Sequence, residues 1–317
     1  MVIRTLDLFH GVGGSSLGAK MAGAQIIAAI DYWEVASQCY SRNFPEALSI
    51  KADIRHVSPE GLHKLIGEID LLVASPECTS HSCARGARDH SEESELTAFQ
   101  VIRFAREFRP KWMVIENVVQ MKLWSRHPEL LEELWGLGYY VREEKLNSQE
   151  FEVPQTRRRL FLMCSLLGNV NYTHPSIKEI KAASSIIDFN GHYRFTPLFS
   201  PKRAKATIER AERAISTLGS KMSFLIVYYS TDGSGGWQPL DRPLRTITTL
   251  DRFAYVRPSA TGHVMRMLQP EELKLAMGFP NGYKLESGTR RDKIKLVGNA
   301  VCPPVMKYVI RSLVSQH

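Results

Sequence analysis

The sequence predicts an α/β protein, in which a sheet has helices on both faces and a second, smaller domain is attached. In the first half of the chain, short apolar segments alternate with amphipathic helical segments, a rhythm typical of a parallel sheet wound between helices. After about residue 170 this rhythm gives way to scattered basic residues and the glycine-rich segment STDGSGGWQP. The change in pattern indicates a second domain.

Five apolar segments are predicted strands: IRTLDLF, AQIIAAID, IDLLVAS, KWMVIEN and RRLFLMC. Helical spacing of apolar residues is found in LTAFQVIRFAREF and PELLEELWGLG between them, in ATIERAERAISTLG, and in PEELKLAMGF and IKLVGNAVCPPVMKYVIRSLV near the end. The last of these is apolar enough to pack back onto the first domain. In such sheets ligands bind outside the carboxyl ends of the strands, so functional residues are expected there.

Composition narrows the class of protein. Lysine and arginine number 41 against 33 acidic residues, and the net charge of +8 favours a polyanionic partner. No apolar run approaches the roughly 20 residues of a membrane span, and the first residues lack a signal-peptide core. We therefore expect a cytoplasmic, monomeric protein with no membrane partner. The five cysteines form no CxxC pair or metal-ligand spacing, so we expect no metal.

A glycine turn follows the first predicted strand. Phe9 leads into His10-Gly11-Val12-Gly13-Gly14, and a helix opens near Ser15. Glycines allow a tight turn close to a ligand, and a helix amino terminus favours a negatively charged group. Asp31 ends the next strand, where a carboxylate can hold ribose hydroxyls, and Asp53 follows a third strand-like segment. Taken alone, this region also fits a dehydrogenase or a purely structural turn.

A cysteine lies at the end of another predicted strand. IDLLVAS runs into Pro76-Glu77-Cys78, and a polar segment with Arg85 and Arg88 follows. A thiol at a strand end near basic groups is a candidate low-pKa nucleophile, although most cysteines are small buried apolar residues.

Polar and charged residues lie at the end of one further predicted strand and at the beginning of another. Glu116 and Asn117 end KWMVIEN, and the last predicted strand begins with Arg157, Arg158 and Arg159, just after Gln155. Alternate residues of a strand share a face, so Arg157 and Arg159 are expected to point one way and Arg158 the other. Glu116 is then either a buried structural carboxylate paired with an arginine or a catalytic carboxylate positioned by one.

Through these residues the chain resembles the DNA (cytosine-5) methyltransferase family of bacterial or phage type. Six segments carry the resemblance in the family's order: DLFHGVGG, SPECTSHS, IENV, VPQTRRR, RPLRTITT and GNAVCPPV. The resemblance implies a Rossmann-like methyltransferase sheet in a catalytic and cofactor-binding domain, residues 1–168. It further implies a target-recognition domain, residues 169–284, and a C-terminal helix returning to the catalytic domain, residues 285–317.

The resemblance also implies the reaction. A cytosine swings out of double-stranded DNA, Cys78 attacks its carbon 6, and carbon 5 takes a methyl group from S-adenosylmethionine. Glu116 binds the ring at N3, Arg159 contacts the ring oxygen, and Arg157 steadies the constellation. The residues implied in cofactor binding are Phe9, Gly11, Gly13, Gly14, Asp31, Tyr32, Asp53, Ile54, Pro76, Asn299 and Val301. Those implied in DNA binding are Arg85, Arg88, Trp237, Gln238 and Thr248.

The chain departs from the family at Glu77, where a second proline usually precedes the nucleophile. A carboxylate pointing at the thiolate would raise the thiol pKa, so we expect Glu77 to turn away or to pair with Arg85. Two readings of the same motifs stay open: an RNA cytosine-5 methyltransferase and a catalytically silent DNA-binding relative. A cognate restriction endonuclease is an expected partner of the bacterial type.

Overall fold

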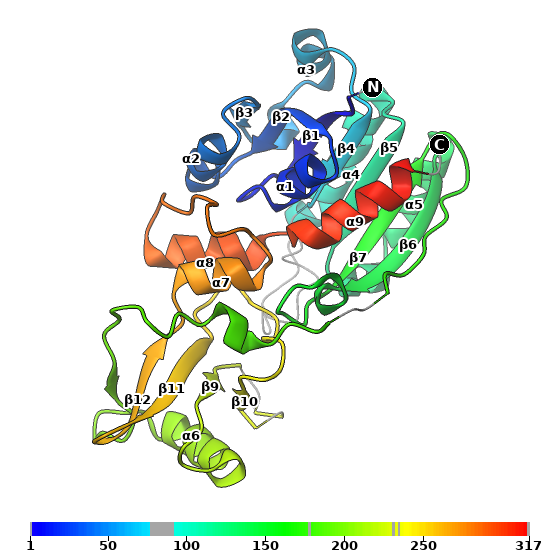
Figure 1. The fold of residues 1–317 in the computed structure, drawn as a ribbon. Helices are drawn as coiled ribbons and strands as arrows, with labels where there is room; N and C mark the ends of the chain where they lie inside the picture. The colour runs from blue at the N-terminus through cyan, green and yellow to red at the C-terminus, as the bar shows by residue number, and fades with distance from the viewer. Residues whose placement is uncertain (1, 77–91, 177–178, 230–231, 234, 316–317) are drawn as a thin grey trace.

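A computed structural model describes residues 2–76, 92–176, 179–229, 232–233 and 235–315. Two sheets divide the molecule (Figure 1). We call the seven-stranded sheet with the helices on its faces the large lobe, and the five-stranded sheet with α6 (Lys205–Leu218) the small lobe. The domain boundaries at residues 168 and 284 stay a proposal, because the positions of the two sheets do not determine the residue at which each domain ends.

The large lobe has a mixed sheet with the strand order β3-β2-β1-β4-β5-β7-β6. Its strands are β1 (Arg4–Leu8), β2 (Gln25–Asp31), β3 (Leu48–Lys51), β4 (Leu71–Ala74), β5 (Trp112–Asn117), β6 (Tyr140–Asn147) and β7 (Arg158–Ser165). The pairs among β1 to β5 are parallel, as predicted, whereas β7 runs antiparallel to both β5 and β6. A fully parallel sheet was therefore a wrong prediction.

The sequence explains this difference. Residues 148–157 join β6 to β7, a connection shorter than the dozen or so residues that a parallel crossover needs. The segment YVREEKLN was not predicted as a strand because it is mostly charged. As the edge strand β6, it keeps much of its length partly exposed and therefore lacks a continuous apolar run.

Helices cover both faces of the large sheet, as predicted (Figure 1). Strand residues alternate between two apolar clusters: Leu71 and Val73 of β4 point into one, and Leu72 and Ala74 into the other. The first cluster is covered by α1 (Gly14–Met21), α2 (Glu34–Asn43) and α9 (Pro303–Val314). The second is covered by α3 (Pro59–Ile66), α4 (Glu92–Phe108) and α5 (His127–Gly136).

Close contact between α1 and α9 brings the end of the chain to the glycine turn. A side-chain carbon at Gly18 would lie 2.6 Å from Met306 Cβ, and one at Gly14 would lie 2.1 Å from Val301 O. Glycine at these two positions therefore lets residues 300–302 lie directly against the first turn of α1. The helix α9 thus lies against the large lobe, where the sequence predicted that the C-terminal helix returns, and the domain assignment stays a prediction.

The end of the chain forms two helices and not one continuous helix. The helix α8 (Arg290–Asn299) ends at Ala300, which has an extended ψ of 148°, and α9 begins at Pro303. Two successive prolines, Pro303 and Pro304, suit the first turn of a helix and cannot lie in its interior, which explains the break. The predicted single helix is corrected accordingly.

The small lobe is an antiparallel sheet with the strand order β10-β9-β11-β12-β8. Its strands are β8 (Thr196–Pro197), β9 (Phe224–Val227), β10 (Trp237–Pro239), β11 (Phe253–Ser259) and β12 (Gly262–Met267). The helix α6 lies against β9 and β10, and α7 (Pro270–Ala276) packs on α8 between the lobes (Figure 1). In the described part of the chain, no helix is long and apolar enough to cross a membrane.

Candidate active site

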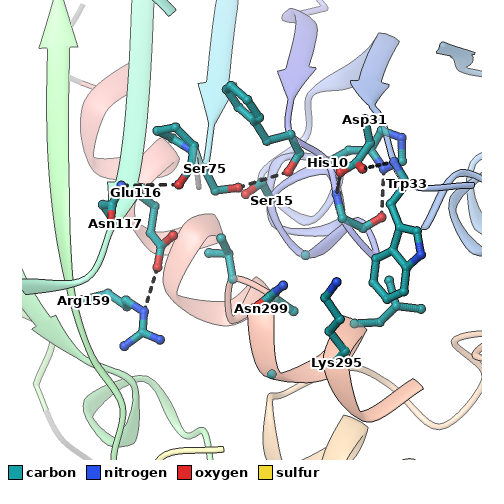
Figure 2. Close-up of a pocket in the computed structure, with 18 of the residues that line it drawn as sticks. His10, Ser15, Asp31, Trp33, Ser75, Glu116, Asn117, Arg159, Lys295 and Asn299 are labelled. Carbon is teal, nitrogen blue, oxygen red and sulfur yellow. Dashed lines mark hydrogen bonds and ion pairs between the residues drawn. The ribbon is translucent and has the colours of Figure 1, made fainter. Parts of the chain in front are cut away.

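A cavity of about 260 Å³ opens at the carboxyl ends of β1, β2, β4 and β5, with α8 and residues 298–301 as its opposite wall. Figure 2 shows Asp31 and Trp33 at one end of it and Glu116 and Arg159 at the other. Of the residues implied in cofactor binding, eight line this cavity: Phe9, Gly11, Gly14, Asp31, Tyr32, Pro76, Asn299 and Val301.

The glycine turn presents backbone N–H groups to the carboxylate of Asp31. Gly11 N donates to Asp31 Oδ2 at 2.8 Å, and Trp33 N donates to Oδ1 at 2.8 Å. The turn uses left-handed backbone at Phe9 (φ 62°), Gly11 (φ 52°) and Gly13 (φ 89°). Because both oxygens are held by the backbone, Asp31 keeps a fixed orientation at the cavity.

Gly13 has a packing role. A side chain there would lie 2.6 Å from the Tyr283 hydroxyl and 2.7 Å from the ring of Phe44, and Gly13 does not line the cavity. Gly11 differs, since a side-chain carbon at that position would have no atom of the described residues within 4 Å. The motif therefore holds one glycine beside open space and another that lets two aromatic side chains close in behind the turn.

Two further residues were expected at the cofactor and lie elsewhere. Asp53 is hydrogen bonded to Arg55 through Nε at 3.0 Å and Nη2 at 2.6 Å, and these bonds lower the pKa of Asp53 to about 2. Ile54 is buried in the core. Neither lines the cavity.

Sequence reasoning missed several residues of the cavity wall, among them an aromatic residue and a lysine. Trp33 and Lys295 both line it, and Lys295 Nζ lies 4.5 Å from the centre of the Trp33 ring. Tyr32, the bulky residue that was predicted there, is 57% exposed. The pair Tyr32-Trp33 offered two aromatic candidates, and only packing distinguishes their positions. Lys295 lies one helical turn before Asn299, so the two share a face of α8.

Glu116 and Arg159 meet at the other end of the cavity. Arg159 Nε lies 3.2 Å from Glu116 Oε1, and the two side chains are 19% and 7% exposed. Burial raises the pKa of Glu116, although Arg159 and Arg157 act in the opposite direction. Asn117 Nδ2 donates to Pro76 O at 3.3 Å and thereby ties the end of β5 to the residue two positions before the predicted nucleophile.

Arg157 holds three segments together. It is 3% exposed and donates to Ile247 O, Gly298 O and Ala300 O at 3.0, 2.9 and 3.1 Å. Gln155 adds to this junction, because its Oε1 accepts from Ile247 N at 2.9 Å and its Nε2 donates to Ala276 O at 3.1 Å. These bonds join the start of β7 to the segment before β11 and to the end of α8.

Arg157 and Arg159 both line the cavity and Arg158 is exposed, as the alternation predicted.

The predicted nucleophile Cys78 and the basic residues Arg85 and Arg88 lie outside the described residues, as does Glu77. The described cysteines, Cys39, Cys164 and Cys302, are all buried. Burial raises the pKa of Cys39 and of Cys302 to about 11, and that of Cys164 further still. No described cysteine is therefore suited to act as a thiolate near neutral pH.

The residues expected to touch DNA differ in accessibility. Gln238 is 4% exposed, donates to Pro243 O at 3.2 Å and accepts from Arg245 N at 3.1 Å. Its amide is thus used inside the small lobe, and its expected contact with a base is corrected. Trp237 packs against the small-lobe core and is partly buried. Thr248 lies beside the cavity wall, where its carbonyl oxygen faces Gly298 of α8.

Comparison with known proteins shows likeness to a family, to curated relatives and to solved structures. Residues 3–315 match the model of the family described as C-5 cytosine-specific DNA methylase. The chain is 26% identical to the type II methyltransferase M.HindV of Haemophilus influenzae, over 99% of this chain and 97% of the relative. It is 31% identical to M.AgeI of Thalassovita gelatinovora, over 89% of this chain and 65% of the relative. The methyltransferase EhMeth of Entamoeba histolytica has the same fold, with a TM-score of 0.72, 18% identity and coverage of 100% and 99%.

Proposed function

The chain belongs to the C-5 cytosine-specific DNA methylase family, and from this membership we propose that it methylates carbon 5 of cytosine in double-stranded DNA with S-adenosylmethionine as donor. One observation carries the proposal. The carboxylate that suits a ribose, Asp31, and the acid that suits a cytosine ring, Glu116, line the same cavity. A methyl donor and its acceptor can therefore meet without crossing bulk solvent.

The residues of one end fit the donor. Asp31 has both oxygens fixed by backbone N–H groups and can still accept from ribose hydroxyls. Phe9 and Trp33 offer apolar walls for an adenine, and the open side of Gly11 with Asn299 leaves room for the amino-acid part. When bound, the cofactor supplies an electrophilic methyl group.

The other end fits the base. We propose that Cys78 Sγ forms a bond to carbon 6, and that Glu116 donates its proton to N3 as the ring electrons shift. The raised pKa of Glu116 keeps that proton available closer to neutral pH. Arg159 would contact the ring oxygen, and Arg157 would hold the walls of the cavity in register. Carbon 5 would then take the methyl group, leaving S-adenosylhomocysteine. Loss of the carbon-5 proton to water would form the double bond to carbon 6 and expel the Cys78 thiolate, and N3 would return its proton to Glu116.

We propose the small lobe as the target-recognition domain, with Arg85, Arg88 and Thr248 on the DNA side. A cytosine has to leave the stack before it can reach Glu116, which costs a few kcal/mol. Contacts to the phosphates on either side offset part of that cost. Two relatives bear the name type II methyltransferase, and this likeness supports a restriction endonuclease as a partner.

The test is to incubate the protein with unmethylated genomic DNA, total RNA and labelled cofactor, and to map methylated cytosines in both nucleic acids by sequencing. We expect methyl groups at one short DNA sequence and none in RNA. Methylation of RNA alone would contradict the proposed substrate. A protein that binds DNA but transfers no methyl group would prove to be a catalytically silent relative. Glu116→Gln is the matched control for contaminating activity.

A further inference from the structure

A lysine from one wall of the cavity contacts an aromatic ring on the other wall. Lys295 Nζ lies 4.5 Å from the centre of the Trp33 ring, within the roughly 6 Å at which the face of an aromatic ring attracts a cation. Lys295 belongs to α8, and Trp33 is the residue just before α2. Both line the cavity, at the end where Asp31 lies (Figure 2). The contact therefore places a positive charge inside the end that suits an adenosine.

Both partners of this contact are held by the surrounding structure. Trp33 N donates to Asp31 Oδ1 at 2.8 Å, and the Trp33 ring packs against the first apolar cluster. The C-terminal end of α8 is held by Arg157, which donates to Gly298 O at 2.9 Å. Because Trp33 is bonded directly to Asp31, the ring that attracts Lys295 has a fixed place relative to that carboxylate.

The Lys295 ammonium group keeps N–H donors for a ligand. Within the described part of the chain, Lys295 takes part in no ion pair. The acid of the same helix, Asp292, has its Oδ2 occupied by Thr289, whose N and Oγ1 donate to it at 2.9 and 2.7 Å. An aromatic face attracts the positive charge but leaves most of the N–H groups without an acceptor. A ligand with oxygen acceptors can therefore bind Lys295 without breaking a protein ion pair.

Charge and hydrogen-bonding capacity decide which part of the cofactor suits Lys295. The sulfonium group of S-adenosylmethionine is positive and has to face the end with Glu116, so repulsion by a lysine is weakest at the opposite end. An ionised Asp31 only accepts hydrogen bonds, so ribose hydroxyls donate to it and keep their oxygen lone pairs. Lys295 only donates, and it supplies the matching partner for those oxygens.

We propose that Lys295 is a further cofactor-binding residue, whose ammonium group donates to the ribose hydroxyl oxygens that Asp31 binds from the other wall, while the Trp33 ring holds the ammonium group in place. The inference rests on the proposed function, because it takes S-adenosylmethionine as the ligand of the cavity. Two alternatives are outcomes of the test. Lys295 could bind the carboxylate of the cofactor's amino-acid part, or it could cover Trp33 only until an adenine displaces it.

The test measures binding of S-adenosylhomocysteine by calorimetry, since this ligand has the same ribose and transfers no methyl group. Lys295→Met removes the charge and keeps an unbranched apolar side chain. We expect it to lower the affinity about tenfold, near the low end for a hydrogen bond to a charged group. With the 2′-deoxy or the 3′-deoxy analogue of the ligand, wild type and variant should bind equally, because the acceptor of Lys295 is then missing.

Matched variants separate this contact from general effects on α8. Lys293→Met makes the same change two positions earlier, at a residue outside the cavity lining, and should leave the affinity unchanged. Trp33→Leu should also lower the affinity. Combined with Lys295→Met, it should cost less than the two single changes together, because Trp33 acts in part through Lys295. Lys295 is exposed, so the melting temperature of Lys295→Met should stay near that of the wild type.

Unchanged affinity in Lys295→Met would overturn the proposal. So would a gain in affinity, because that result shows that Lys295 only covers Trp33. A loss that persists with both deoxy analogues and disappears with a decarboxylated ligand would assign Lys295 to the carboxylate instead. Failure of the proposed function is seen separately, as absence of binding by the wild type.

Discussion

Arg159 Nε lies 3.2 Å from Glu116 Oε1, across the antiparallel neighbours β7 and β5. Burial of Glu116 raises its pKa more than the two nearby arginines lower it. The pair therefore combines an acid whose pKa is raised by burial with a cation beside it. A structural ion pair would favour the ionised carboxylate, so the direction of this shift supports the catalytic reading.

Glu116→Gln should keep the fold and lower the methylation rate by a factor of about 10² to 10⁴, the usual contribution of a general acid. The amide has the same shape as the carboxylic acid but cannot donate a proton to N3. Single-turnover methylation with saturating DNA measures the effect. A variant that turned over at the rate of the wild type would leave Glu116 with a structural role only.

Cys78→Ser should abolish methyl transfer and leave DNA affinity almost unchanged, because the thiol contributes covalent chemistry and little binding energy. A duplex with 5-fluorocytosine at the target should form a covalent adduct with the wild type and none with the variant. The adduct is detected as a shifted band under denaturing conditions. Cys83→Ser is the matched control, and an adduct that vanished in that variant would move the nucleophile to Cys83.

Asp7 gives a prediction for stability as a function of pH. It is fully buried, and desolvation raises its pKa from 3.8 to about 7. Below pH 3.8 both the folded and the unfolded chain hold the proton. As the pH rises from 3.8 to 7 only the unfolded chain releases it readily, so the free energy of unfolding falls, by about 4 kcal/mol at most, and then levels off.

Asp7→Asn should remove the pH-dependent part of the free energy of unfolding that comes from Asp7, because an amide does not titrate. The fold should be retained, because asparagine can still accept the hydrogen bond from Ser16 Oγ. Urea unfolding of both proteins between pH 5 and 8 measures it. The stability of the wild type relative to the variant should decrease across that range. Curves that ran parallel would show that Asp7 does not titrate there.

Much of the fold follows from local patterns. The central strands β4 and β5 are continuous apolar runs, and the helices between strands have regular apolar spacing, so both could be predicted. The strand β6 could not, because an edge position tolerates the charges of YVREEKLN and leaves no periodic signal. The break at Ala300 was missed although Pro303 and Pro304 indicated it.

The candidate site was predictable where residue type alone specifies chemistry. This holds for Asp31 and Glu116, and for Arg157 and Arg159 at the start of the β7 segment. It was not predictable where packing decides orientation. Gln238 follows a glycine-rich segment that suggests contact with DNA, yet its amide binds Pro243 and Arg245 inside the small lobe. Trp33 and Lys295 meet across elements far apart in sequence, a contact that no local pattern contains.

Arg157→Met should destabilise the protein by about 3 kcal/mol. The change removes a buried cation whose hydrogen bonds to Ile247 O, Gly298 O and Ala300 O join the residue before β7 to the segment at Ile247 and to the end of α8. Carbonyl oxygens that lose their donor stay buried, which adds to the loss. Denaturant unfolding measures the change. Arg158→Met, at the exposed neighbouring position, is the control, and equal losses in the two variants would exclude a special role of Arg157.

Gly298→Ala tests how closely α8 approaches the small lobe. An added methyl group at Gly298 would lie 2.2 Å from Thr248 O and 2.7 Å from Thr249 N, so the backbone on one side has to move. We expect a loss of stability of about 1 to 3 kcal/mol, the range for overpacked sites. Because Gly298 also lines the cavity, cofactor affinity should fall as well.

Gly136→Ala makes the same chemical change as Gly298→Ala at a site where we expect stability to rise and not to fall. Gly136 is the last residue of α5, and a methyl group there has no atom within 4 Å. Helix propensity then raises stability by up to about 1 kcal/mol. Gly298 is helical too, so propensity alone predicts a gain at both positions. Calorimetry should instead give changes in stability of opposite sign, since only at Gly298 does contact with Thr248 outweigh propensity, and cofactor titration should show a loss of affinity for Gly298→Ala alone. A gain in stability at Gly298 would mean that α8 and the Thr248 segment separate easily, and that the cavity wall they form is not rigid.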